Sequence, residues 1–126
     1  MNILITGSAG FIGFHLTKEL SKDKNYKIFG IDNLNTYYDI NLKKKRLKIL
    51  RNNKNFSFLK IDIVNEKLIN NFFTKNKIHV IYHLAAQAGV RYSITSPKTY
   101  LENNITGFFN ILEVSKKFNV KHLLFA

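Results

Sequence analysis

The sequence predicts an α/β fold in which helices cover both faces of a parallel sheet. Two observations indicate it. Short apolar runs alternate with longer amphipathic stretches along all 126 residues, and a glycine-rich turn, Gly7–Gly13, follows the first run. Strands that alternate with helices pair in parallel through right-handed crossovers, which gives a doubly wound sheet of strand order 3-2-1-4-5. We therefore expect one domain over residues 1–126, ending after its fifth strand.

Each expected strand is a short apolar run, and each expected helix is an amphipathic stretch. The strands are expected at Asn2–Thr6, Lys27–Ile31, Phe56–Ile61, His79–His83 and His122–Phe125. The helices are expected at Phe11–Ser21, Asp39–Arg51, Glu66–Lys75 and Pro97–Phe118. Proline is favoured in the first turn of a helix, so Pro97 marks the start of the last one. A long loop, Leu84–Ser96, precedes it.

The strand order predicts where a ligand binds. In an open parallel sheet, ligands bind outside the carboxyl ends of the strands, at the point where the strand order reverses. That point lies between the first and fourth strands. The turn Gly7–Gly13 and the loop Leu84–Ser96 should line the crevice there.

Composition excludes several classes of function. The chain has no cysteine, and its first apolar run is too short for a signal peptide or a membrane span, so we expect a soluble cytoplasmic protein without a membrane partner. The net charge of +12 is densest at Lys43–Arg46, which is typical of a solvated helix face or of a nucleic-acid surface. We favour the solvated face and expect no nucleic-acid partner.

The four histidines lack the spacing of metal ligands, so no metal site is expected. His83 ends the fourth strand and is expected to have a structural role.

The glycine turn is the strongest functional signal. Gly7, Gly10 and Gly13 are spaced three residues apart, between an expected strand and an expected helix. Glycines let the backbone approach a pyrophosphate closely, and a helix N-terminus offers free N–H groups and a positive dipole end. A purely structural turn is the alternative. The acid at the end of the second strand favours dinucleotide binding.

That acid is Asp32, 19 residues after Gly13. An acid in this position can accept hydrogen bonds from the adenosine ribose hydroxyls. The alternative is an aspartate that caps the following loop. No arginine follows Asp32 closely, so no residue is expected to hold a 2′-phosphate, and NAD is favoured over NADP. Asp62 and Ile63, after the third strand, could contact the adenine or simply end that strand.

These motifs resemble those of a known family. The relevant stretches are Thr6–Gly13, Asp32–Leu34, Asp62–Ile63, His83–Ala86 and Asn103–Gly107. Their sequences and their order resemble the extended short-chain dehydrogenases/reductases, which include the NAD-dependent sugar-nucleotide epimerases and dehydratases. Two further stretches, Asn33–Asp39 and Ala86–Ser93, are similar to those of UDP-glucuronate 4-epimerases of capsule and surface-polysaccharide synthesis.

The resemblance implies a Rossmann-type domain that binds NAD, and it implies a role for each matching residue. Gly7, Gly10, Phe11, Ile12 and Gly13 would surround the pyrophosphate, Asp32 and Asn33 would hold the adenosine ribose, and Asp62 and Ile63 the adenine. Leu84, Ala85 and Ala86 would contact the ribose next to the nicotinamide, and Asn103 would brace the cofactor loop.

Arg91 is the candidate substrate-binding residue, because it lies in the loop at the switch point. A guanidinium there could pair with a sugar carboxylate or a phosphate. The alternative is an exposed loop arginine.

The family's catalytic pair is missing from the chain. In the enzymes that the chain resembles, a tyrosine four residues before a lysine transfers the proton. None of the six tyrosines of this chain has that spacing. We therefore expect no catalytic residue within the chain and no turnover by the chain alone. We expect the chain to be the N-terminal part of an epimerase. The implied parent enzyme oxidises a UDP-sugar at C4 and returns the hydride to the opposite face. A homodimer of the full-length protein, a non-catalytic dinucleotide-binding module and a related 4,6-dehydratase are left open.

Overall fold

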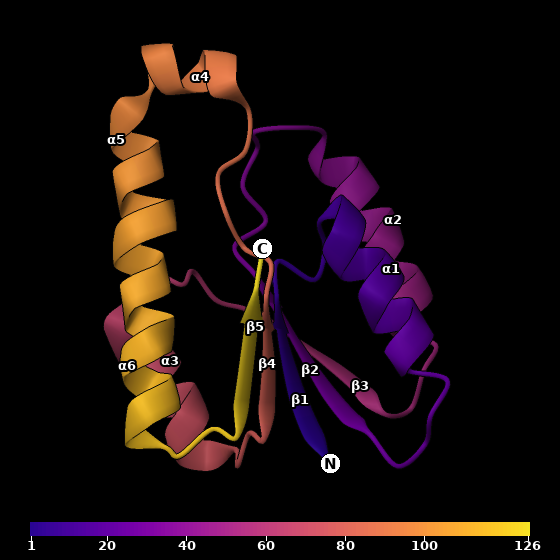
Figure 1. The fold of residues 1–126 in the computed structure, drawn as a ribbon. Helices are drawn as coiled ribbons and strands as arrows, with labels where there is room; N and C mark the ends of the chain where they lie inside the picture. Colours follow the sequence, from indigo (N-terminus) through magenta and orange to yellow (C-terminus); the bar gives the residue numbers. More distant parts are fainter.

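A computed structural model describes residues 1–126 and contains one five-stranded sheet (Figure 1). The strands are β1 (Asn2–Thr6), β2 (Lys27–Asp32), β3 (Phe56–Lys60), β4 (Val80–His83) and β5 (His122–Phe125). Their order in the sheet is β3-β2-β1-β4-β5, and every neighbouring pair is parallel. The predicted fold class and strand order are therefore confirmed. All carboxyl ends meet at one edge of the sheet.

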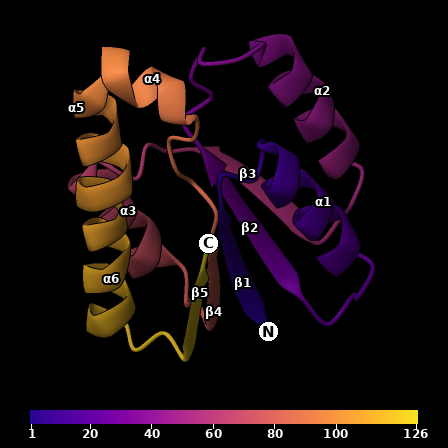
Figure 2. The ribbon, with the colours of Figure 1, turned by 45° about the horizontal axis from the view of Figure 1, so that its top comes forward.

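Helices cover both faces of the sheet. They are α1 (Phe11–Leu20), α2 (Ile40–Leu50), α3 (Glu66–Lys75), α4 (Val90–Thr95), α5 (Pro97–Tyr100), the π-helix η1 (Leu101–Gly107) and α6 (Phe108–Lys117). In both views, α1 and α2 lie on one side of the sheet, and α3 and α6 on the other (Figures 1 and 2). None of these helices has the length and apolar character needed to cross a membrane.

The core has two halves, one on each side of the sheet. Successive side chains of a strand point to opposite faces. Accordingly, Ile3 and Ile5 belong to the cluster that holds Phe14 of α1, whereas Leu4 belongs to the cluster that holds Phe72 of α3. Because both faces of the central strand are buried, its register is strongly specified.

Two segments differ from the sequence prediction. The loop expected over residues 84–96 contains a short helix, α4, and the single helix expected over Pro97–Phe118 is divided into α5, η1 and α6. Apolar periodicity does not separate a π-helix from an α-helix, because one extra residue in a turn leaves the amphipathic pattern recognisable. Such widened turns are rare and often lie at functional sites.

The basic run on α2 also differs from the prediction. Lys43 is only 4% exposed and shares the buried face of the helix with Leu47 and Leu50, whereas Lys44 and Lys45 are exposed. The expected solvated face is therefore wrong for Lys43. A lysine stem can pack along apolar surface while its ammonium reaches a polar region, so the residue type alone does not reveal burial.

Candidate functional site

A cleft of about 270 Å³ opens at the carboxyl edge of the sheet, where the strand order reverses. Its walls come from the turn after β1, the end of β2 and the loop behind it, the residues after β3 and β4, and η1. Among its lining residues are Gly7, Gly10, Asp32, Asn33, Ile63, Leu84, Ala85, Ala86 and Asn103, all of them predicted from sequence. The fold therefore brings together residues that are distant along the chain.

Gly7 is a glycine for two separate reasons. Its φ of +70° lies in the left-handed region, and a Cβ there would come within 2.9 Å of the backbone nitrogen of Ala85. The Gly7 N–H donates to the carbonyl of Ile31 at 2.8 Å, and Gly10 N–H donates back to Gly7 at 2.9 Å. The turn is thereby fixed against β2 and the β4 loop, with its backbone facing the cleft.

Other residues of the predicted pyrophosphate site do not line the cleft with their side chains. Phe11 and Ile12 are 67% and 62% exposed at the start of α1. The backbone of Gly13 packs against the backbone of Gly7, since a Cβ at Gly13 would overlap the carbonyl oxygen of Gly7. Gly13 thus permits α1 to begin close to the glycine turn.

Asp32 ends β2 and is buried in the wall of the cleft. One carboxylate oxygen accepts the N–H of Leu34 at 2.8 Å, and the other accepts the N–H of Ala9 at 3.2 Å. The side chain therefore caps the following loop, which was the alternative interpretation from sequence. Each carboxylate oxygen has a second lone pair, so Asp32 can still accept hydrogen bonds from a bound diol.

Asp62 supports Asn33 rather than lining the cleft. Its carboxylate accepts the side-chain N–H of Asn33 at 3.2 Å and the N–H of Val64 at 3.0 Å. Ile63 is buried and forms part of the cleft wall. The two residues of this pair thus act in different ways, one through a hydrogen bond and one through apolar surface.

Thr6 is a site residue that the sequence analysis did not assign. Its hydroxyl accepts the N–H groups of Leu84 and Ala85, each at 3.0 Å, and it lies 2.8 Å from Nδ1 of His83. The predicted structural role of His83 is confirmed, because its ring is hydrogen-bonded and buried. Burial lowers the pKa of His83 to about 4.

The loop after β4 is held from the other side by η1. The side-chain amide of Asn104 accepts the N–H of Gln87 at 2.7 Å and donates to the Gln87 carbonyl at 3.0 Å. Asn104, which the sequence analysis did not assign, thus braces the loop after β4, and the bracing role of Asn103 toward the cofactor stays a prediction. No local sequence signal distinguishes two adjacent asparagines.

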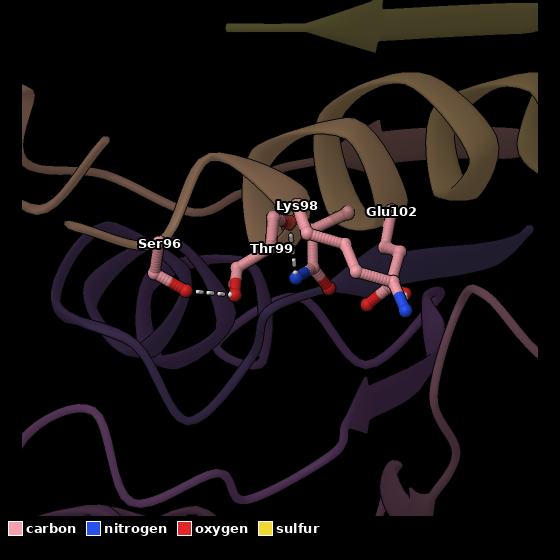
Figure 3. A network of polar contacts seen from close by, with 5 residues as sticks. Ser96, Lys98, Thr99 and Glu102 are labelled. Atoms are coloured by element: carbon pink, nitrogen blue, oxygen red, sulfur yellow. Dashed lines mark hydrogen bonds and ion pairs between the residues drawn. The ribbon is translucent and has the colours of Figure 1, made fainter. Parts of the chain in front are cut away.

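Asn103 lines the cleft and is positioned from within its own helical segment. Its side-chain N–H donates to the carbonyl of Thr99 at 2.9 Å. Figure 3 shows the Ser96 and Thr99 hydroxyls pointing toward one another, 2.7 Å apart, where this segment begins. These contacts fix the turn from which η1 enters the cleft wall.

Arg91 lies on α4, outside the residues that line the cleft. Its side chain is exposed and makes no hydrogen bond or ion pair. The next residue, Tyr92, packs on Tyr37 with ring centroids 4.9 Å apart, and Tyr37 itself lines the cleft. The segment that carries Arg91 is therefore joined to the rim, and the substrate role of Arg91 stays a prediction.

Two cations on α2 also lie at the cleft or near it. Lys43 lines the cleft, and its ammonium donates to the side-chain oxygen of Asn35 at 2.8 Å. The Arg46 guanidinium donates to the carbonyl of Ala9 at 3.2 Å and to the hydroxyl of Tyr38 at 3.0 Å. Both residues belong to the basic run Lys43–Arg46 that the sequence analysis singled out. The sequence of this run did not show which of its side chains face the cleft.

Comparison with known proteins places the chain in a family. Residues 4–126 match the family model described as GDP-mannose 4,6 dehydratase. The chain belongs to this family. The resemblance to sugar-nucleotide epimerases and dehydratases that its motifs indicated is thereby confirmed.

Curated relatives of the chain include a protein named as an epimerase. The chain is 48% identical to Protein CapI of Staphylococcus aureus, covering 100% of this chain and 37% of that protein. It is 45% identical to a UDP-glucuronate 4-epimerase of Thermodesulfobacterium geofontis, covering 98% and 38%. The chain thus spans well under half the length of these curated relatives.

Solved structures of epimerases are also similar to the chain. The crystal structure of UDP-glucuronic acid 4-epimerase from Bacillus cereus in complex with UDP-glucuronic acid and NAD matches with a TM-score of 0.87 and 36% identity. The match covers 99% of this chain and 39% of that one. A UDP-Glc/GlcNAc 4-epimerase from Campylobacter jejuni matches with a TM-score of 0.88 and 28% identity, covering 98% and 36%.

Proposed function

We propose that the chain is the NAD-binding domain of a nucleotide-sugar 4-epimerase, with UDP-glucuronate and UDP-galacturonate as its substrate pair. The observation that carries the proposal is the cleft that unites the glycine turn with the Asp32 carboxylate at the strand-order reversal. Relatives named as UDP-glucuronate 4-epimerases and a similar structure that holds NAD support it.

The residues present fit a dinucleotide. A side chain at Gly7 would meet the backbone of Leu84 and Ala85, so this part of the turn leaves only backbone at the cleft. An anionic pyrophosphate is suited to that backbone and to the N-terminus of α1. Asp32, with its free lone pairs, is suited to a ribose diol, and Ile63 offers apolar surface for a base.

Bound NAD would supply a reversible hydride acceptor, which is the chemistry that inversion at a sugar carbon requires. The chain's own residues bind and orient. The glycine turn holds the diphosphate, and Asp32 accepts from the ribose. Thr6 fixes the backbone of Leu84 and Ala85, which line the cleft. His83 stays neutral at pH 7, so it adds no charge there.

Arg91 provides the reason for an acidic sugar. A guanidinium can bind a carboxylate through two parallel hydrogen bonds, which a neutral sugar does not offer. Its segment is attached to the cleft rim through Tyr92 and Tyr37. We therefore propose that Arg91 binds the substrate carboxylate, and the name of the CapI relative supports a role in surface-polysaccharide synthesis.

Calorimetric titration with NAD tests the cofactor proposal directly. We expect the chain to bind NAD more tightly than NADP, because a 2′-phosphate would face the Asp32 carboxylate. Asp32→Ala should weaken NAD binding about ten- to a hundredfold, since a hydrogen bond to a charged group contributes about 1.5–3 kcal/mol. Glu113→Ala, an exposed acid on α6, is the matched control. A folded chain that binds no NAD would contradict the proposal.

The substrate proposal needs the remaining part of an epimerase. We suggest a chimera in which this chain is followed by the corresponding remainder of the Staphylococcus aureus relative. Conversion of UDP-glucuronate to UDP-galacturonate, followed by chromatography, is the expected result. A folded chimera that binds NAD but turns over only a neutral or GDP-linked sugar would favour another reaction of the family, such as dehydration.

A further inference from the structure

Lys43 is an unusual residue for its place in the fold. The residue is 4% exposed, and charged groups are rarely buried unless they are paired. The ion pairs of the chain are Lys22–Glu19 and Lys98–Glu102, so no carboxylate lies within 4.0 Å of the Lys43 ammonium. The burial of this charge is therefore not explained by a salt bridge.

The contacts of the ammonium leave part of its capacity unused. Nζ donates to the side-chain oxygen of Asn35 at 2.8 Å and to the Asn35 carbonyl at 3.1 Å. It also lies 4.6 Å from the centroid of the Tyr38 ring. An ammonium has three donors, so one N–H has no hydrogen-bond acceptor in the chain.

Lys43 shares the cleft with Asp32. Both residues line it. Burial, the largest effect, lowers the pKa of Lys43. The Asp32 charge raises this pKa, and the nearby Arg46 lowers it. Two residues of opposite charge thus line one cavity without forming an ion pair. A hydroxyl group that donates to the carboxylate and accepts from the ammonium would satisfy both.

We propose that Lys43 is a second contact for the adenosine ribose and that it determines the discrimination between NAD and NADP. Its free N–H donates to a ribose hydroxyl on the side opposite Asp32. The inference rests on the proposed binding of NAD. The inference lowers the expected preference for NAD over NADP. A ribose site with one anion and one cation repels a 2′-phosphate less than a site with Asp32 alone.

The test compares the affinities for NAD and NADP of the unmodified chain, Lys43→Met and Lys44→Met. Lys44 is an exposed lysine on the same helix and is the matched control. We expect Lys43→Met to weaken NAD binding about tenfold and NADP binding by several times more, so that the preference for NAD increases. Lys44→Met should leave both affinities unchanged.

The ratio of the two affinities separates this role from a purely structural one. If Lys43 only supported the Asn35 loop, Lys43→Met would weaken both dinucleotides by the same factor, and the unchanged ratio would overturn the inference. If the unmodified chain bound neither dinucleotide, the proposed function itself would fail. The two failures are therefore distinguishable.

A second variant covers the case in which Lys43→Met does not fold, as judged by circular dichroism. Asp32→Asn removes the anion and leaves Lys43 in place. We expect this variant to bind NADP at least about tenfold more tightly than the unmodified chain does, because the cation then faces the 2′-phosphate unopposed. No gain in NADP affinity would show that Lys43 does not face that position and would overturn the inference.

Discussion

The hydroxyl of Thr6 lies 2.8 Å from Nδ1 of His83, and this contact joins the ends of the two strands between which the cleft opens. The Thr6 oxygen already accepts two backbone N–H groups, from Leu84 and Ala85. The hydroxyl proton therefore points to His83, whose Nδ1 must be unprotonated to accept it. A charged His83 could not accept this hydrogen bond from Thr6.

The first prediction concerns the pH dependence of stability. The pKa of His83 is about 4 in the folded chain and near its ordinary value of 6.5 in the unfolded chain. Between these values the unfolded state binds more protons, so stability rises with pH. The contribution of His83 is complete above about pH 6.5, is lost as the pH falls toward about 4, and is on the order of 3 kcal/mol.

Urea unfolding of the unmodified chain and of His83→Asn checks this prediction. The difference in unfolding free energy between the two should shrink as the pH is lowered from about 7.5 to about 4.5. His122→Asn, at an exposed histidine on β5, is the matched control variant. Parallel pH profiles for the unmodified chain and His83→Asn would contradict the assignment.

The second prediction concerns the close approach of α1 to the glycine turn. Alanine at a helical position normally stabilises relative to glycine, but a Cβ at Gly13 would overlap the carbonyl of Gly7. We expect Gly13→Ala to lower the unfolding free energy by about 1–3 kcal/mol and to weaken NAD binding, because the turn must shift.

Gly10→Ala is the graded comparison for Gly13→Ala. A Cβ at Gly10 would lie 3.1 Å from the same carbonyl oxygen, a much milder contact. We therefore expect a smaller loss of stability, measured by urea unfolding under the same conditions. Equal stability of Gly13→Ala and the unmodified chain would show that the turn relaxes freely.

The third prediction concerns Arg91 in the chimeric enzyme described above. Arg91→Ala should lower kcat/KM for UDP-glucuronate about a hundredfold, or ~2.7 kcal/mol, because a bidentate carboxylate contact is lost. Arg91→Lys should recover only part, since an ammonium lacks the planar fork. NAD affinity should not change, and Lys98→Ala, at a nearby exposed cation on α5, is the control. Unchanged kinetics in Arg91→Ala would remove the main residue-level argument for an acidic sugar.

The fourth prediction is that the 126-residue chain shows no epimerase turnover by itself. None of its six tyrosines lies four residues before a lysine, so it lacks the proton-transfer pair of the resembling enzymes. The measurement is incubation with NAD and UDP-glucuronate, followed by chromatography for UDP-galacturonate. Turnover by purified chain would show that another group transfers the proton.

The sequence by itself determined the sheet and the place of the cleft. Alternating apolar runs and amphipathic stretches require parallel strands with crossovers of one hand, so the strand order follows from local patterns. The turn Gly7–Gly13 and the acid Asp32 were readable for the same reason, because each is defined by its distance from a strand end. The comparisons confirm the family that these motifs indicated.

Only the tertiary structure decided which side chains meet across that cleft. The burial of Lys43, the Thr6–His83 contact and the support of Gln87 by Asn104 each join segments that separate elements bring together. The local sequence shows a basic run, a threonine and two adjacent asparagines, and it does not specify which of them faces inward. That choice depends on the packing of helices against the sheet, where a side chain's partner is set by its position in space rather than by its neighbours along the chain.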